Sequence, residues 1–260
     1  MTRIAIVLVL IAFAADGKVG TTYARAAASL MPPTSPAVAP ATSPAVPPAS
    51  IPAVVPTFRS ALQQKPPRNP RLFAPQDLGL LEPPDREAWQ KPDQVMDALH
   101  VAERTTVADL GAGGGWFTMR LARRVGPNGR VYAVDVQRLM IEAIRRRIER
   151  EGLTDRVETV LGAYDDPRLP ADARTDAVLI VDAFHEMEDP VRLLKNVSRT
   201  LKPQGRIGII DYREGDGGPG PDAAERVPPS VVISQAAAAG LKLVEQHTFL
   251  PYQYFLIFGK

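Results

Sequence analysis

The sequence predicts an α/β fold built on a doubly wound sheet of seven strands. Two observations carry this prediction. From residue 107 onward, short runs rich in β-branched residues alternate with amphipathic stretches, and the last two runs are separated only by a short turn at residues 250–252. Alternating strands and helices place a parallel sheet between two layers of helices, and the closing pair adds an antiparallel hairpin.

The first strand leads into a glycine-rich turn. In VADLGAGGGWFT, residues 107–118, an apolar run ends in Asp109 and is followed by glycines at every second position, Gly111, Gly113 and Gly115. This pattern is typical of a strand that enters a tight turn and opens a helix, where bare backbone can approach a nucleotide-like ligand.

A dinucleotide-binding fold begins in a similar way and is the competing interpretation. Its fingerprint, counted from Gly111 and Gly113, needs a third small residue three positions on so that the helix packs closely on the strand. That position holds Trp116. An oxidoreductase that uses a dinucleotide is therefore disfavoured.

The remaining elements follow in order. Their apolar runs are nearly continuous, as expected of strands covered on both faces. The helices end at glycine, at Gly-Pro or at Lys-Pro. We expect strands at 130–135, 157–162, 176–182, 206–211, 241–249 and 253–260, and helices at 116–124, 137–151, 189–201 and 231–239.

An acid closes the second strand. Asp135 ends RVYAVD, about twenty residues beyond the glycine turn, the separation that an intervening helix gives between parallel strands. A carboxylate at this place can accept both hydroxyls of a ribose. Taken alone, Asp135 could instead cap the helix that begins near Gln137.

These features together resemble the class I S-adenosylmethionine-dependent methyltransferases. The acid and alternating glycines resemble that family's first motif, and DAFHEMEDP, LLKNVSRTLKPQGR and LPYQYFLIF are similar to a bacterial branch with many exported members of undefined substrate. The resemblance spans roughly 86–260 and implies a Rossmann-like fold with S-adenosyl-L-methionine as cofactor. It weakens at residues 211–229, a loop expected to border the acceptor site.

The resemblance also implies a set of cofactor-binding residues. Asp109 would orient the turn or the cofactor's amino group, the glycines would let the backbone approach, and Asp165 or Asp166 would receive the adenine amino group. The full set is Asp109, Gly111, Ala112, Gly113, Gly115, Asp135, Val136, Asp165 and Asp182.

Methyl transfer needs positioning and exclusion of water, and a base when the acceptor is a hydroxyl or an ammonium group. The candidate catalytic residues follow the fourth strand: Asp182, His185 and Glu186. Histidine ionises nearest neutral pH, although His185 could equally cap a helix or bond backbone. No metal is expected, and a chain without cysteine cannot use a thiol nucleophile.

The charge pattern favours a small-molecule acceptor. The net charge is only +2, and the arginines at 145–147 and 150 share an amphipathic helix with Glu142, Glu149 and Glu151, which is typical of a solvated face. No zinc-ligand or aromatic-basic motif is present, so a nucleic-acid partner is not expected.

The N-terminus predicts export or anchoring. An uninterrupted apolar run at residues 4–15 fits a signal peptide, and residues 31–56 are rich in Pro, Ala and Ser. We expect a signal peptide or membrane anchor at 1–26, a linker at 27–82 and the methyltransferase domain at 83–260. The protein would then be periplasmic or tethered to the inner membrane, or cytoplasmic if Met31 is the true start.

Export conflicts with the supply of a cofactor that is made in the cytoplasm. An exported binding module of methyltransferase fold, without turnover, is therefore the second hypothesis. Binding of S-adenosylmethionine and S-adenosylhomocysteine separates the two hypotheses.

Overall fold

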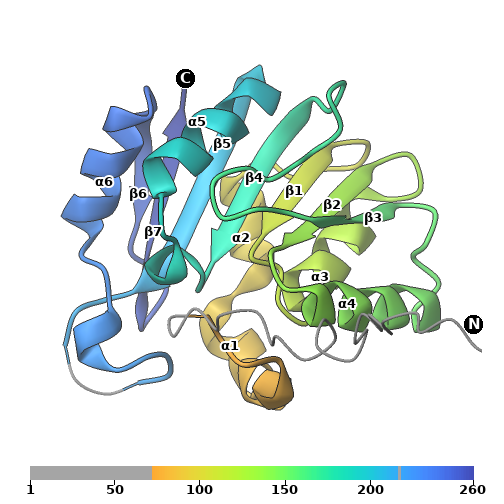
Figure 1. Cartoon of the computed structure of the whole chain (residues 1–260), viewed down its shortest axis with the longest axis horizontal. Coiled ribbons are helices and arrows are strands. Elements are labelled where there is room, and N and C mark those ends of the chain that lie inside the picture. Colours follow the sequence, from red (N-terminus) through yellow and green to blue (C-terminus); the bar gives the residue numbers. More distant parts are fainter. Residues whose placement is uncertain (1–71, 216–217) are drawn as a thin grey trace, which may run out of the picture. The chain divides into compact units, whose positions relative to one another are not determined.

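A computed structural model describes residues 72–215 and 218–260. In this part of the chain a seven-stranded sheet has the order β3-β2-β1-β4-β5-β7-β6 (Figure 1). Strands β1 to β5 pair in parallel, and β7 runs antiparallel to both β5 and β6. The predicted fold class and its closing hairpin are confirmed. The strands are β1 (Thr106–Leu110), β2 (Arg130–Asp135), β3 (Val157–Leu161), β4 (Thr175–Val181), β5 (Leu201–Tyr212), β6 (Lys242–His247) and β7 (Gln253–Gly259).

The strand bounds differ most from the prediction at β5, which begins five residues earlier than expected. Leu201 pairs with Thr175, and the register then shifts before Arg206 pairs with Ala177. The inserted residues include Pro203, which lacks the N–H that a regular ladder needs. A bulge of this kind hides a strand start from a sequence pattern.

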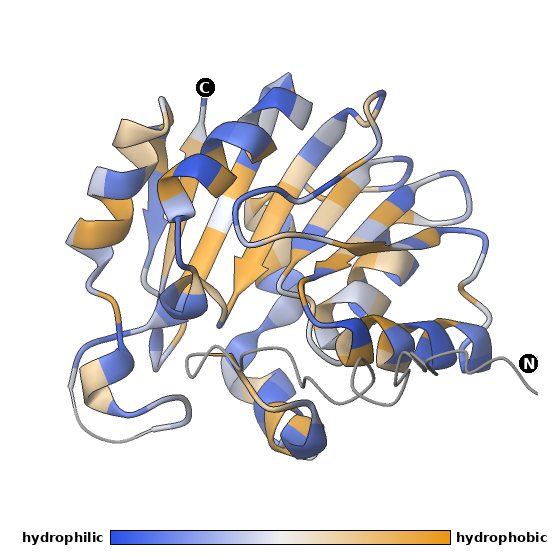
Figure 2. Ribbon diagram, in the orientation of Figure 1, coloured by the Kyte–Doolittle hydropathy of each residue, from blue (hydrophilic) through white to orange (hydrophobic). Residues whose placement is uncertain are grey.

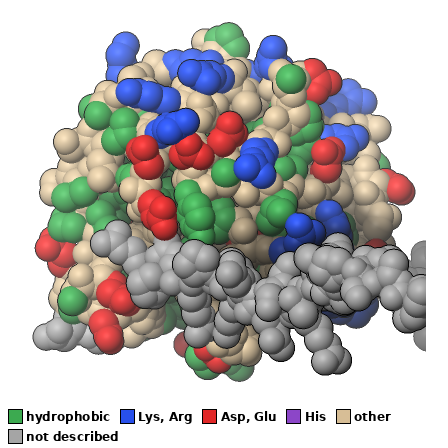
Figure 3. All heavy atoms as spheres, viewed as in Figure 1, with side chains coloured by type: hydrophobic (Ala, Val, Ile, Leu, Met, Phe, Trp, Pro, Cys, Tyr) green, Lys and Arg blue, Asp and Glu red, His purple; other side chains and the backbone are tan. Residues whose placement is uncertain are grey.

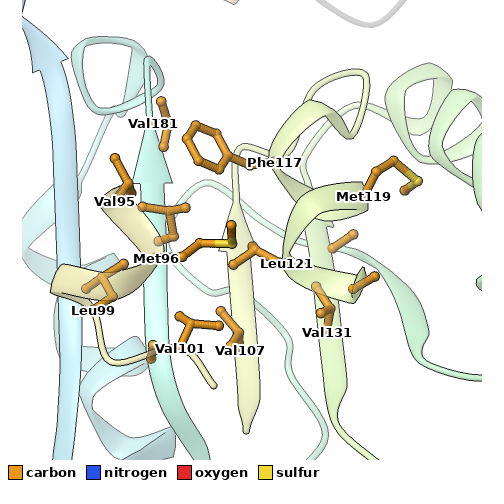
Figure 4. Packing of buried hydrophobic residues seen from close by; sticks show 14 of the residues in the cluster. Val95, Met96, Leu99, Val101, Val107, Phe117, Met119, Leu121, Val131 and Val181 are labelled. Atoms are coloured by element: carbon orange, nitrogen blue, oxygen red, sulfur yellow. The ribbon is translucent and has the colours of Figure 1, made fainter. Parts of the chain in front are cut away.

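Helices cover both faces of the sheet. One buried cluster joins α2, α3 and α4 to the sheet, and Figure 4 shows Met96 and Leu121 from two of these helices against Val107 of β1. A second cluster joins α5 and α6 to the opposite face. The strands appear in Figure 2 as the most hydrophobic elements. The helices are η1 (Pro75–Leu81), α1 (Arg86–Gln90), α2 (Pro92–Ala98), α3 (Trp116–Val125), α4 (Arg138–Arg150), η2 (Phe184–Glu186), α5 (Pro190–Thr200), η3 (Ala223–Glu225) and α6 (Pro229–Ala238).

The sheet order determines where a site can form. After β1 the chain moves to β2 on one side, whereas β4 lies on the other side of β1. Ligands of open α/β sheets bind at such a switch point, outside the carboxyl ends of the strands. On the face seen in Figure 3, Lys and Arg side chains gather toward the upper edge, with a second group at the lower right.

The described residues begin before the expected domain boundary at 83, since η1 and the segment around it already belong to this part of the chain. The expected signal peptide, residues 1–26, and most of the expected linker lie outside the described residues. Within residues 72–215 and 218–260, no helix has both the length and the apolar character needed to cross a membrane.

Candidate active site

A cavity of about 1020 Å³ opens at the carboxyl ends of β1, β2, β4 and β5. One wall is the glycine turn with the end of β2, and the opposite wall is made by η2, Tyr212 and residues 219–231. Residues 72–73 and 80–83 also line it. The volume is at the upper end of what drug-sized ligands occupy, so it can hold a nucleoside-sized cofactor beside a small second molecule.

The glycine turn needs glycine for geometric reasons. Gly111, Gly113 and Gly115 have φ values of 71°, 54° and 80°, in the left-handed region that side chains rarely adopt. A Cβ on Gly111 would lie 2.5 Å from the Cβ of Ala183. Gly111, Ala112 and Gly113 line the cavity, whereas Gly115 is the N-cap of α3. The turn therefore presents backbone to a ligand.

Asp135 connects the end of β2 to the glycine turn. Its carboxylate accepts hydrogen bonds from the backbone N–H of Gly113 at 3.0 Å and of Gln137 at 2.8 Å. Burial raises the pKa of Asp135 to about 6, although bonds from these amides oppose the shift. The carboxylate thus supports the start of α4 and also lines the cavity beside Val136, and each oxygen keeps a second lone pair for a ligand.

Asp109 is bonded to helix α3. The Thr118 hydroxyl donates to its carboxylate at 2.6 Å, and burial raises the pKa of Asp109 to about 6. Because this bond joins the end of β1 to the helix beyond the turn, Asp109 holds the turn's two ends together. It also contributes to the cavity wall.

Asp182 follows β4 in a left-handed conformation, with φ of 54°. Arg86 approaches its carboxylate at 3.3 Å, the Tyr212 hydroxyl donates to it at 3.3 Å, and the Gln253 amide donates to the other oxygen. A ring closes through Gln90, which accepts from Arg86 at 2.9 Å and donates to Gln253 at 2.6 Å. Burial raises the pKa of Asp182 to about 7, and Arg86 opposes the shift.

His185 and Asp211 form a dyad. Both carboxylate oxygens of Asp211 lie 3.0 Å from Nδ1 of His185, whose backbone N–H also donates to Asp211 at 3.0 Å. Burial alone would lower the pKa of His185, but the hydrogen bond and charge of Asp211 outweigh it and raise the pKa. Since a carboxylate can only accept, Nδ1 carries the proton and Nε2 is left as the basic nitrogen.

Glu186 meets the segment that precedes η1. The backbone N–H of Phe73 donates to Glu186 at 3.2 Å, and the Gln137 amide donates to the Phe73 carbonyl at 2.8 Å. Phe73 therefore bridges the ends of β2 and β4 across the cavity. Burial raises the pKa of Glu186 to about 7, and its Oε1 lies 3.9 Å from His185 Nε2.

Some candidates lie elsewhere. Asp165 is absent from the cavity wall among the described residues, because its carboxylate pairs with Arg192 of α5 at 3.0 Å. No described group of His, Asp and Glu side chains has the arrangement of a metal site.

Sequence reasoning missed Asp211, Arg86 and Gln253. Asp211 ends a strand, as Asp135 does, but its partner His185 belongs to another strand's loop. Only the adjacency of β4 and β5 in the sheet brings the two together. The sequence did offer one signal for Asp211: an acid stands at or near the end of each of two successive strands, Asp182 after β4 and Asp211 in β5.

Comparison with known proteins agrees with this geometry. A family model described as a methyltransferase domain matches residues 107–205. A demethylmenaquinone methyltransferase of Lactobacillus johnsonii is 30% identical over 127 residues, 48% of this chain and 50% of that protein. The chain spans about half the length of the curated relatives that it matches.

Solved structures extend the similarity. A SAM-dependent methyltransferase from Aquifex aeolicus has a TM-score of 0.68 at 27% identity, covering 72% of this chain and 98% of that one. The [4+2]-cyclase SpnF, with a TM-score of 0.55 at 18% identity over 66% of this chain and 80% of its own, shares the fold alone.

Residues 107–205 match a methyltransferase domain, and the chain is similar to class I S-adenosylmethionine-dependent methyltransferases, whose cofactor is S-adenosyl-L-methionine. The residues present fit this cofactor. Gly111 and Gly113 line the cavity with backbone that carries no side chain, and Asp135 lines the same cavity with a carboxylate that two hydroxyls can share.

Proposed function

We propose that the protein transfers a methyl group from S-adenosylmethionine to a small-molecule acceptor, and that His185, oriented by Asp211, removes the acceptor's proton. The observation that carries this proposal is the dyad itself: His185 Nδ1 lies 3.0 Å from Asp211 in the wall of the cavity that the glycine turn also lines. A base held in one tautomer beside a cofactor site is the arrangement that proton removal requires.

Different residues of the chain would bind the cofactor and remove the proton. The cofactor, when bound, supplies an electrophilic methyl group. The backbone of the glycine turn and the Asp135 carboxylate would hold it. His185 Nε2 takes a proton, and the negative charge of Asp211 stabilises the imidazolium that results. Glu186, 3.9 Å from Nε2, adds to that stabilisation when it is ionised.

Water exclusion is assigned to the segment before α1. Leu72, Phe73 and Leu81 line the cavity, and Phe73 is held on both sides by Gln137 and Glu186. In-line displacement at a methyl group depends on alignment and on a dry site. This segment would supply the dry site.

The acceptor is proposed to be small and not a nucleic acid. The name of the Lactobacillus johnsonii relative gives that protein a demethylmenaquinone substrate. For this chain it supports only the class of acceptor, because the match covers half of the relative.

We propose further that residues 1–26 direct the protein to or across the membrane and that residues 27–82 include the connecting linker. The apolar run at residues 4–15 supports this proposal. Fractionation of cells that express the full chain, with N-terminal sequencing, tests it. A cytoplasmic protein starting at Met31 would contradict it.

Calorimetry with the full chain tests the main proposal. S-Adenosylmethionine and S-adenosylhomocysteine should both bind with one site, and NAD should not bind. Failure of both to bind removes the enzyme hypothesis. In a second experiment the chain is incubated with a cell extract and S-adenosylmethionine labelled in its methyl group. If the cofactor binds but no fraction of the extract becomes labelled, a binding module is favoured instead.

A further inference from the structure

The charged groups around the acceptor side of the cavity indicate what kind of molecule can enter. This side is lined by His185, Glu186, Met187, Leu193, Tyr212 and residues 219–221, 224–228 and 231. Most of these side chains are apolar. A charged acceptor would therefore need an ion in the wall that is free to pair with it.

The two arginines of the wall already have partners. Arg86 is bonded to Asp182 and Gln90, and it lies 4.4 Å from the centre of the Trp116 ring. Arg226 donates to three main-chain carbonyls, those of Pro221 at 3.1 Å, Arg213 at 3.1 Å and Gly215 at 3.0 Å. Arg226 thus organises the loop that forms the wall. The charge of Arg86 is thus neutralised by Asp182, and the bonded N–H groups of Arg226 are directed at main-chain carbonyls of the loop.

The carboxylates near His185 also have hydrogen-bond partners within the protein. Asp182 accepts from Arg86, Tyr212 and Gln253. Asp211 accepts from His185 and also from the backbone N–H of Tyr212 at 2.8 Å, and its side chain has no exposed surface.

Three glutamates line the cavity among the described residues, and one of them, Glu82, is paired with Arg147. Glu186 accepts from Phe73 and faces the imidazole of His185, so its charge is directed at the dyad. Glu225 is exposed at the rim, where water screens its charge. Neither is placed to hold an ammonium group at the depth of His185.

The Tyr212 hydroxyl already has a hydrogen-bond partner and does not provide a polar group for a charged acceptor. Its hydroxyl donates to Asp182, and the backbone of Gly220 packs against its ring, since a Cβ there would lie 2.7 Å from ring carbons. The Arg226 guanidinium also lies 5.6 Å from the ring centre, so the ring adds apolar surface to the wall but is not an open stacking platform.

Resting on the proposed function, we propose that the acceptor is an uncharged, largely apolar molecule whose methyl-accepting atom is the oxygen of an acidic hydroxyl, of the phenol or enol class. The acceptor oxygen gives its proton to His185 Nε2 and forms a bond to the methyl carbon. The methyl–sulfur bond breaks with its electron pair left on sulfur, and the proton passes from His185 to solvent.

The acceptor hydroxyl must be acidic because the base that takes its proton is an imidazole, which is a weak base. A phenol has a pKa of about 10, within reach of an imidazole, whereas an alkyl hydroxyl is close to water at about 15.7. The His185–Asp211 dyad can therefore draw the proton from a phenol much more readily than from an alkyl hydroxyl, which would have to lose its proton in concert with the attack on the methyl group.

Four probes that share a naphthalene ring test this proposal: 2-naphthol, 2-naphthalenemethanol, 2-naphthylmethylamine and 2-naphthoic acid. The full chain is first saturated with S-adenosylhomocysteine, and each probe is titrated by calorimetry. 2-Naphthol should bind at least tenfold more tightly than the amine or the acid, and its fluorescence should show the naphtholate form. In the variant His185→Gln the naphtholate signal should disappear while binding persists.

Methyl transfer gives a second readout. With labelled S-adenosylmethionine, 2-naphthol should be methylated and 2-naphthalenemethanol should not. Preferred binding or methylation of the amine or the acid, or no binding of 2-naphthol to the cofactor-loaded protein, overturns the proposal. If S-adenosylhomocysteine itself does not bind, the proposed function fails instead, so the two failures are distinct.

Discussion

The two halves of the cavity hold their polar groups in different ways. In the cofactor half, defined by residues 109–115 and 135–137, Asp135 is bonded to main-chain amides, and Asp109 to a threonine nine residues away. In the acceptor half, defined by Asp182, His185, Asp211 and Tyr212, side chains are bonded to side chains from distant elements. Local sequence thus builds the first half, and the order of the sheet builds the second.

The largest effect should come from removing the base. His185→Ala is expected to lower kcat at least about 100-fold, because general bases contribute that much or more. The dissociation constant for S-adenosylmethionine should stay within about twofold, since the base belongs to the acceptor half. Steady-state kinetics and calorimetry measure the two quantities.

His100→Asn is the matched control. His100 is exposed and has φ of 56°, a conformation that asparagine tolerates. It should leave turnover unchanged. Equal loss in both variants, or unchanged turnover in His185→Ala, would remove His185 from the mechanism.

A methyl group on the glycine turn should disrupt the cofactor half. Gly111→Ala adds a Cβ that meets Ala183 at 2.5 Å in a left-handed backbone. We expect cofactor affinity to fall roughly 100-fold, about 2.7 kcal/mol.

The control variant Gly240→Ala separates the effect of backbone strain from the effect of a steric collision. Gly240 has φ of 84° with nothing within 4 Å of an added Cβ. This variant should lose about 1 kcal/mol of unfolding free energy and no cofactor affinity. Similar affinities for the two variants would show that the turn does not contact the cofactor.

Asp211→Asn should change the pH profile. Asp211 raises the pKa of His185, and His185 must be neutral to accept a proton. Without that charge the pKa of His185 falls, so the acidic limb of the kcat profile should move to lower pH. The maximum should fall roughly 50-fold, because the tautomer is no longer fixed.

The neighbouring acids Asp182 and Glu186 also act on His185 and stay in place in this variant. If the acidic limb of the kcat pH profile does not move in Asp211→Asn, His185 is not the group that titrates there. Thermal unfolding of the variant checks that the backbone bonds of Asp211 are not the source of the change.

The smallest expected effect belongs to Asp135. Asp135→Asn should weaken S-adenosylmethionine binding about tenfold, as charge-assisted hydrogen bonds become neutral ones. The pKa of Asp135 is about 6, so it is ionised above that value. Wild-type affinity should therefore fall as the pH drops through 6, and the variant's affinity should fall less, because only Asp109, whose pKa is also about 6, still titrates there. Calorimetry from pH 5 to 8 measures this, and a parallel pH dependence in both proteins would contradict it.

Prediction from sequence succeeded where signals are local. The glycine turn and Asp135 lie within thirty residues, and periodicity gave every strand of the sheet, with errors at bulged ends such as that of β5. The acceptor half was predicted only on the β4 side, because Asp211, Arg86 and Gln253 come from elements 26, 96 and 71 residues away from their partners. Nothing in a local pattern states which distant polar residues will meet.

Strand β7 follows β6 in the chain but lies between β5 and β6, and its first residue, Gln253, holds Asp182. During synthesis, β1 to β5 can pair before β7 has emerged, but the acceptor half cannot be completed until β7 has inserted. Long-range pairings of this kind form late. A nascent chain would therefore acquire its cofactor turn and the His185–Asp211 dyad first, and the hydrogen bonds that hold Asp182 last.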